Sequence, residues 1–255
     1  MTTAELEGRV ALVTGGGRGI GRAIALALAA DGADVALSYH RDDAAAASTV
    51  ADIEALGRRA RAYQAAVESA EDGERLVGSV AGDLGPSEDV VNNAGIASRG
   101  RSVADTVPDE VDRLLGAHAV GPHHLCRLVV PAMRERPRGD IVFISSVATD
   151  HMAANGAPYN MAKAAMEALA LTLAKEERRH GIHVNVVAPG LVETEMGRRL
   201  VKAVGVTDMR TLDATMPFGR VCQPEDVAGA VRFLVSGGAS YVTGQRIRVD
   251  GGGPA

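Results

Sequence analysis

The sequence lacks tryptophan, and aromatic residues make up only 3% of its 255 residues. Its core must therefore be built mainly from Ala, Val, Leu and Ile, in a chain that is 46% hydrophobic overall. The two cysteines, Cys126 and Cys222, are too few and too far apart for a disulfide framework or a metal cluster. We therefore expect both thiols to be reduced and no metal to be bound.

The sequence also lacks a strong excess of positive charge and any long apolar run. Its net charge of −5 gives no reason to expect a nucleic-acid partner. No apolar run approaches the length of a membrane span. Residues 1–9 contain two glutamates and no apolar core, so they do not resemble a signal peptide. We expect a cytoplasmic protein without a membrane partner.

What the sequence does contain is an alternation of short apolar segments with alanine-rich amphipathic ones. This pattern predicts a single α/β domain over residues 1–255, a doubly wound parallel (Rossmann) sheet of about seven strands with helices on both faces. The expected strands are 9–14, 33–39, 59–67, 89–91, 141–145, 182–187 and 245–249. The expected helices are 22–30, 42–56, 70–83, 108–134 (bent near residues 121–122), 157–180 and 226–235.

A glycine-rich loop follows the first expected strand and precedes the first helix. Gly15 permits a tight turn, Gly19 lets the backbone approach a pyrophosphate, and Gly21 permits close packing of the helix. The helix N-terminus, near Ile20, then faces the anion. The order of strand, loop and helix predicts a dinucleotide site at the carboxyl ends of the strands.

The end of the second strand indicates which dinucleotide is bound. NAD sites usually place an acidic residue there, to hold the ribose 2′-hydroxyl. Here the strand ends with His40 and Arg41, and the first acid is Asp42. Together with Arg18 in the glycine loop, these cations favour a 2′-phosphate. NADP(H) is therefore the favoured cofactor, and NAD(H) remains possible.

Tyr159 and Lys163 are four residues apart on an expected helix and so share one of its faces. A nearby ammonium group favours phenolate, so we expect Lys163 to lower the pKa of Tyr159 and suit it to proton transfer. Ser146, at the end of the preceding strand, could offer its hydroxyl to the same substrate oxygen. Residues 191–216 lack a regular pattern and are interpreted as a substrate lid.

The ordered set of motifs resembles the short-chain dehydrogenase/reductase family, and most closely its 3-oxoacyl-(acyl-carrier-protein) reductase-like branch. The motifs are Thr14-Gly15-x-x-x-Gly19-x-Gly21, Asn92-Asn93-Ala94-Gly95, Ser146, Tyr159-x-x-x-Lys163, Pro189-Gly190 and Val249-Asp250-Gly251-Gly252. The resemblance covers essentially the whole chain. It implies an oxidoreductase that interconverts a ketone and a secondary alcohol, and a homotetramer.

The resemblance also implies a role for each site residue. Tyr159 is the general acid, Lys163 holds the nicotinamide ribose, and Ser146 binds the substrate oxygen. Besides Tyr159, Lys163 and the glycine-loop residues, the implied cofactor contacts are Val67, Asn92, Ala94, Gly95, Pro189, Gly190, Val192 and Thr194.

Three positions depart from the family pattern. His118 replaces a catalytic asparagine, Ala66 replaces an aspartate that usually holds the adenine, and Asp89 replaces an aliphatic strand residue. A buried unpaired carboxylate is unfavourable, so Asp89 should have a partner or its strand should be shifted. These departures motivate an alternative function, a catalytically impaired cofactor-binding sensor or scaffold.

Two substrate classes stay open, a small free ketone and a 3-oxoacyl thioester on an acidic carrier protein. The second class would need a basic docking surface. Candidate residues lie at the ends of two expected helices: Arg134, Arg136, Arg138, Arg178, Arg179 and His180.

Overall fold

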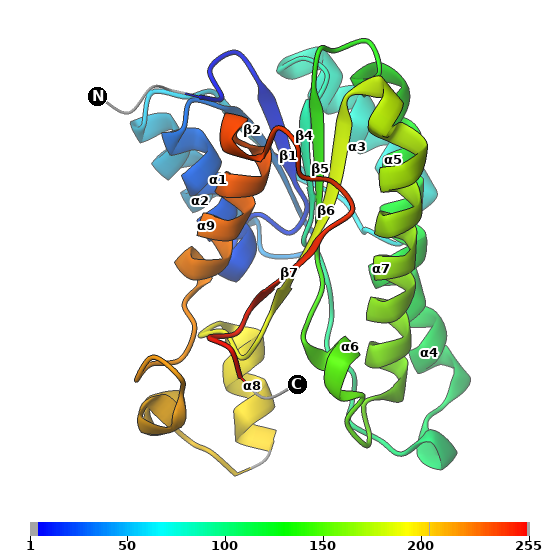
Figure 1. Cartoon of the computed structure of the whole chain (residues 1–255), viewed down its shortest axis with the longest axis vertical. Helices are drawn as coiled ribbons and strands as arrows, with labels where there is room; N and C mark the ends of the chain where they lie inside the picture. The colour runs from blue at the N-terminus through cyan, green and yellow to red at the C-terminus, as the bar shows by residue number, and fades with distance from the viewer. Residues whose placement is uncertain (1–4, 204, 254–255) are drawn as a thin grey trace.

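Seven parallel strands form one sheet in the order β3-β2-β1-β4-β5-β6-β7 (Figure 1). The computed structural model describes residues 5–203 and 205–253. The strands are β1 (Val10–Val13), β2 (Asp34–Tyr39), β3 (Ala60–Gln64), β4 (Asp89–Asn92), β5 (Gly139–Ile144), β6 (Ile182–Pro189) and β7 (Arg246–Val249). The predicted doubly wound sheet is thus confirmed, because the chain reverses its strand order between β3 and β4.

Helices cover both faces of this sheet, as the alternating pattern predicts (Figure 1). One face carries α1 (Gly19–Ala30), α2 (Asp43–Ala55) and α9 (Pro224–Val235). The other carries α3 (Ala70–Asp83), α4 (Pro108–Leu115), α5 (Gly121–Met133) and α7 (Ala157–Glu177). The short α6 (Ala148–His151) and α8 (Glu195–Ala203) lie beyond the carboxyl ends of the strands.

The sheet separates two hydrophobic layers. On β1, Ala11 and Val13 face the layer beneath α1 and α9, while Val10 and Leu12 face the layer beneath α5 and α7. This alternation places an apolar side chain on each face of a strand that is fully buried. Phe143 on β5 is fully buried in the second layer, and aliphatic residues dominate both.

The expected long helix over 108–134 differs from prediction, because a π-helical turn, Gly116–Val120, separates α4 from α5. A side chain at Gly121 would place its Cβ 2.1 Å from the Val67 carbonyl oxygen. The glycine therefore lets the start of α5 lie against the loop after β3. Turns of this kind concentrate at functional sites, and His118 lies within this one.

The region 191–216 is more regular than the sequence suggested. It contains α8, an amphipathic helix, and a 3₁₀ segment, Met209–Thr215. Buried Val201, Met209 and Val221 form a small separate core under these elements. The short strongly charged segments obscured this pattern in the sequence.

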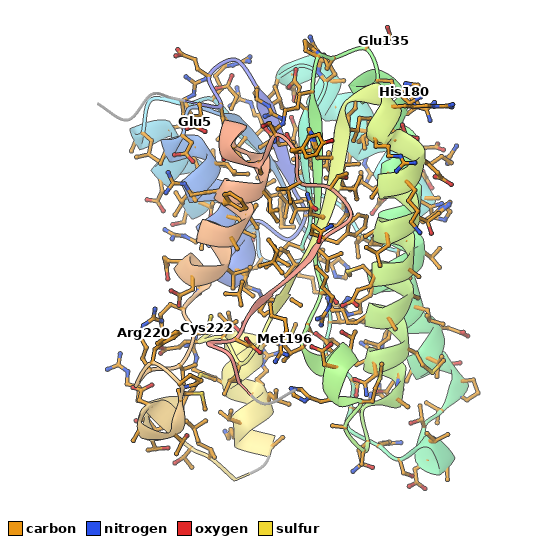
Figure 2. The ribbon with its side chains drawn as sticks, viewed as in Figure 1. Glu5, Glu135, His180, Met196, Arg220 and Cys222 are labelled. Carbon is orange, nitrogen blue, oxygen red and sulfur yellow. The ribbon has the colours of Figure 1, made fainter. Side chains whose placement is uncertain are left out.

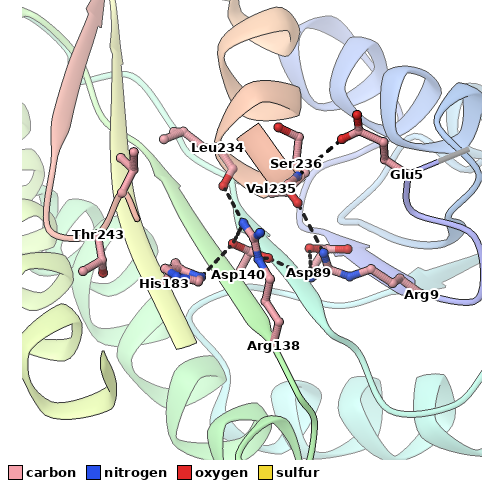
Figure 3. Close-up of polar contacts among 12 residues, drawn as sticks. Glu5, Arg9, Asp89, Arg138, Asp140, His183, Leu234, Val235, Ser236 and Thr243 are labelled. Carbon is pink, nitrogen blue, oxygen red and sulfur yellow. Dashed lines mark hydrogen bonds and ion pairs between the residues drawn. The ribbon is translucent and has the colours of Figure 1, made fainter. Parts of the chain in front are cut away.

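Asp89 has the partner that its burial requires (Figure 3). The Arg9 guanidinium lies 2.6 Å from Asp89 Oδ1 and 2.8 Å from Asp140 Oδ2. Arg138 and His183 also face Asp140, so the group lies at the amino ends of β1, β4, β5 and β6. Burial raises the pKa of Asp89, although Arg9 opposes that effect. The expectation of a partner is confirmed.

Within residues 5–203 and 205–253, no helix has both the length and the apolar character needed to cross a bilayer.

Candidate active site

The glycine-rich loop between β1 and α1 has the backbone geometry of a phosphate cradle. Gly15 and Gly19 have φ angles of +65° and +54°, which side-chain-bearing residues rarely adopt. A Cβ at Gly21 would lie 2.3 Å from the Gly15 carbonyl oxygen, so helix and loop pack too closely for any side chain. Arg18 precedes α1 without capping it, which leaves the first helical N–H groups for a ligand anion.

The loop is tied to the end of β4 by Thr14 and Asn93. Thr14 Oγ1 accepts hydrogen bonds from the backbone N–H groups of Asn93 and Ala94, both at 3.0 Å. Asn93 Nδ2 donates to the Thr14 carbonyl at 2.8 Å. The Asn92 side chain points the other way, into the core, with Nδ2 3.8 Å from Cys126 Sγ. The sequence motif includes Asn93 but predicts no role for it, although neighbouring residues of an extended chain point to opposite faces.

The three cations expected near a 2′-phosphate lie in different surroundings. His40 and Arg41 are both exposed at the end of β2. Arg18 Nη1 instead forms an ion pair with Glu195 Oε2 at 2.6 Å, which links the glycine loop to the first turn of α8.

Ala66 stands where the family pattern has an aspartate that usually holds the adenine. Its backbone N–H donates to Asp72 Oδ2 at 2.7 Å.

Tyr159 and Lys163 lie on the first turns of α7, beside the end of β5. Lys163 Nζ is 5.7 Å from the centre of the Tyr159 ring and donates to the Ile144 carbonyl at 2.7 Å. Only 4% of Lys163 is exposed. Ser146 follows β5, where its Oγ accepts the Ala148 N–H at 3.1 Å, and its side chain lowers the pKa of the Tyr159 phenol. The structure thus brings the three predicted catalytic residues together.

Burial is the largest influence on the pKa values of Tyr159 and Lys163. Desolvation raises the pKa of Tyr159, and the hydrogen bond with Ser146 opposes the rise. Desolvation also lowers the pKa of Lys163 to about 7, against an opposing attraction to Glu167. The expectation that the Tyr159 pKa would be lowered is therefore wrong for the cofactor-free chain. Sequence spacing places the cation correctly but does not reveal how deeply both groups are buried.

His118 reaches the same site from the π turn. Its ring centre lies 5.4 Å from that of Tyr159, at an edge-on angle of 83°. Nε2 lies 3.2 Å from the Ile96 nitrogen and 2.9 Å from the Ile96 oxygen, and the tautomer decides which bond forms. Gly95 makes room for the ring, because a Cβ there would lie 2.4 Å from His118 Cε1.

The environment of His118 keeps its imidazole neutral at pH 7. Burial and then the positive charge of Lys163 lower the His118 pKa to about 3, while the bond to Ile96 acts in the opposite direction. Nδ1 is buried and has no hydrogen-bond partner within the described part of the chain. His118 can therefore relay a hydrogen bond, but it carries no charge of its own near Tyr159.

The remaining predicted cofactor residues surround the same carboxyl edge of the sheet. Pro189 ends β6, and the Gly190 N–H bonds the Val249 carbonyl at 3.0 Å. Thr194 lies beside the glycine loop, because a Cβ added at Gly19 would be 3.4 Å from Thr194 Cγ2. Three further predicted residues are Ile20 on α1, Val67 after β3, and Val192, which forms an isolated bridge to Cys222.

The basic residues suggested for carrier docking lie at the other end of the molecule. Figure 2 shows His180, which ends the short 3₁₀ segment after α7, far from Met196 on α8. Arg134 pairs with Glu177 at 2.6 Å, Arg136 with Glu88 at 3.2 Å, and Arg138 with Asp140 at 2.9 Å. Half of the six cations are thus neutralised by carboxylates, which weakens the docking interpretation.

Comparison with known proteins places this site in a family. Residues 15–253 match the family described as Enoyl-(Acyl carrier protein) reductase. The chain is 40% identical to cyclohexanol dehydrogenase from Rhodococcus sp. (strain TK6), over 97% of this chain and 96% of that protein. It is 36% identical to 3-oxoacyl-[acyl-carrier-protein] reductase from Synechocystis sp. (strain ATCC 27184 / PCC 6803 / Kazusa), over 97% of both chains.

Solved structures agree over nearly the whole chain. A 7α-hydroxysteroid dehydrogenase complexed with NADH and 7-oxo glycochenodeoxycholic acid superposes with a TM-score of 0.89, at 33% identity over 99% of this chain and 96% of that one. A short chain dehydrogenase from Burkholderia cenocepacia J2315 in complex with NADP gives 0.86, at 35% identity over 97% and 98%. The chain belongs to the short-chain dehydrogenase/reductase family of oxidoreductases.

Proposed function

We propose that this protein is an NADP(H)-dependent oxidoreductase that interconverts a ketone and a secondary alcohol, with Tyr159 as the general acid and base. The observation that carries this proposal is the meeting of the Tyr159 phenol with Ser146 and buried Lys163 at the edge of the sheet that holds the glycine loop. Hydroxyl, phenol and ammonium groups can donate a proton to the oxygen of a carbonyl under reduction and stabilise the negative charge that develops on it.

The residues present fit a bound nicotinamide dinucleotide. The glycine loop offers uncapped N–H groups to a pyrophosphate, and the close packing at Gly21 leaves the backbone itself as the binding surface. When bound, the cofactor supplies or accepts a hydride. Ser146 donates a hydrogen bond to the substrate oxygen, which stabilises negative charge developing there.

Tyr159 delivers the proton in the reductive direction. Because burial raises its pKa, the phenol stays protonated at neutral pH and is available as a donor. Once the proton has left, the Lys163 ammonium, 5.7 Å from the ring centre, stabilises the phenolate. With a pKa of about 7, Lys163 can also take part in returning a proton to the site.

The preference for NADP(H) rests on the charge at the end of β2. His40 and Arg41 are exposed there and can approach a 2′-phosphate. Asp42, the first acid, uses its carboxylate to cap α2 by accepting the Ala45 N–H at 3.1 Å. It is therefore engaged away from the role that an acid plays in NAD sites.

The substrate is a small-molecule ketone or alcohol, with a carrier-bound 3-oxoacyl thioester as a second possibility. We assign α8 and the following 3₁₀ segment to a lid, because Met196 and Leu200 expose apolar side chains beside the site end of the sheet. We further expect a cytoplasmic homotetramer. A catalytically impaired sensor or scaffold is the alternative, favoured by His118 and Ala66.

The test is a parallel titration with NADPH and NADH followed by a ketone screen. We expect tighter binding of NADPH, and Arg41→Glu should reverse that preference. Turnover of any ketone should disappear in Tyr159→Phe while NADPH binding persists. Binding without turnover by the parent protein would instead support the sensor, and equal binding of both dinucleotides would contradict the proposed cofactor preference.

A further inference from the structure

One carboxylate oxygen behind the catalytic residues gathers three donors. Glu167 lies four residues after Lys163 on α7, and its Oε1 accepts hydrogen bonds from Ser145 Oγ at 2.5 Å and Thr149 Oγ1 at 3.0 Å. Arg246 Nε, on β7, donates to the same oxygen at 3.0 Å. The side chains of Glu167 and Arg246 are only 15% and 20% exposed. Neither residue is among the expected cofactor or catalytic residues.

Arg246 uses its remaining nitrogens on the segment that carries the catalytic serine. Nη2 donates to the Ser146 carbonyl at 3.2 Å and to Thr149 Oγ1 at 2.8 Å, while Nη1 lies 3.1 Å from Asp150 Oδ2. The last strand of the chain is thereby bonded to the turn between β5 and α6. A guanidinium group suits this task because it presents several donors in one rigid plane.

We propose that Glu167 and Arg246 form a positioning pair, which fixes the backbone at Ser146 and sets the charge on Lys163. This inference rests on the proposed oxidoreductase function. Glu167 attracts the Lys163 ammonium from the next turn of the same helix, and Arg246 offsets that attraction by binding Glu167. Neither member touches the reacting atoms, so each acts through Ser146 or Lys163.

The other titratable groups near Lys163 are mostly uncharged. Tyr159 lies beside it on α7, and neutral His118 faces it from the π turn. Asp150 on α6 lies beyond Arg246 and is also 3.7 Å from Arg248. Within the described residues, Glu167 is the charged partner that opposes the effect of burial on the Lys163 pKa. Removing either member of the pair should therefore move that pKa, and in opposite directions.

The chain offers a direct measurement, because it contains only three lysines, Lys163, Lys175 and Lys202. Carbon-13 NMR of lysine-labelled, cofactor-free protein can follow the titration of each one. Glu167→Gln should lower the Lys163 pKa, and Arg246→Gln should raise it, each by on the order of one unit. Arg246→Lys retains the charge and should return the value toward that of the parent.

Glu177→Gln is the matched control, because Glu177 pairs with Arg134 at 2.6 Å at the far end of the same helix. It should lower stability without moving the Lys163 titration. Unchanged Lys163 pKa values in Glu167→Gln and Arg246→Gln, or shifts of the same sign, would overturn the inference. Opposite shifts of the Lys163 pKa support the inference. The part of the pH–rate profile of ketone reduction that depends on Lys163 should then shift in the same direction as the pKa in each variant.

The two proposals fail in different ways. The NMR titration needs neither cofactor nor turnover, so by itself it decides whether Glu167 and Arg246 set the charge on Lys163. If the parent protein reduces no ketone, the proposed function is contradicted, whatever the lysine titration gives.

Discussion

Replacing Arg9 with methionine should destabilise the protein strongly, because it would leave two buried carboxylates without their shared cation. Arg9 Nη2 lies within 2.8 Å of both Asp89 and Asp140, and the Asp89 side chain is 0% exposed. Removing one partner of a buried ion pair typically lowers the free energy of unfolding by about 3–5 kcal/mol. In a chain of this size, that corresponds to a melting temperature lower by roughly 6–20 °C.

The assay is urea unfolding of Arg9→Met beside Arg61→Met as a control. Arg61 pairs with Glu54 at 3.7 Å, with both side chains more than half exposed, so its loss should change stability by less than about 1 kcal/mol. Asp89→Val in the Arg9→Met background should restore much of the loss. A loss in Arg9→Met no larger than that in Arg61→Met would refute the reasoning.

The effect should also depend on pH with a defined sign. The pKa of Asp89 is raised in the folded state, so folding favours its protonated form. The stability from Asp89 is complete below its unfolded pKa and is lost as the pH rises through the folded value. The defect of Arg9→Met should therefore shrink in acid, where Asp89 is neutral and needs no cation.

Three further predictions concern the site. Gly121→Ala should lower stability by about 1–3 kcal/mol and weaken NADPH binding, because its Cβ would lie 2.1 Å from the Val67 carbonyl; unchanged denaturation and binding would contradict this. Glu195→Gln should tighten NADPH binding by no more than about fivefold, by releasing exposed Arg18, and weaker binding in a fluorescence titration would refute it. Lys163→Met should stabilise the protein at pH 7. The folded pKa of Lys163 is about 7 against 10.5 unfolded, so the unfolded state binds more protons between these values and parent stability rises with pH there. Urea midpoints across that range should rise more steeply in the parent than in the variant; parallel slopes would contradict the burial of Lys163.

Sequence alone was sufficient for the architecture, and it predicted which residues gather at the carboxyl edge of the sheet. Strand–helix alternation depends on local hydrophobic periodicity, which the printed residues carry directly. The glycine loop and the Tyr159-to-Lys163 spacing are also local, so their positions in the fold followed without further information. That Asp89 needs a partner followed from the cost of removing a carboxylate from water. That the partner is Arg9 did not follow from the sequence.

Long-range features could be decided only by the tertiary structure. The expected lowering of the Tyr159 pKa was wrong because the degree of burial is a property of the assembled core, not of residue spacing. The link from Glu167 to Arg246 spans 79 residues and arises because β7 pairs with β6 beside α7. The sequence determined which residues could carry the chemistry. Packing decided which charges face one another and how strongly, because electrostatic interactions depend on distance and on exclusion of water.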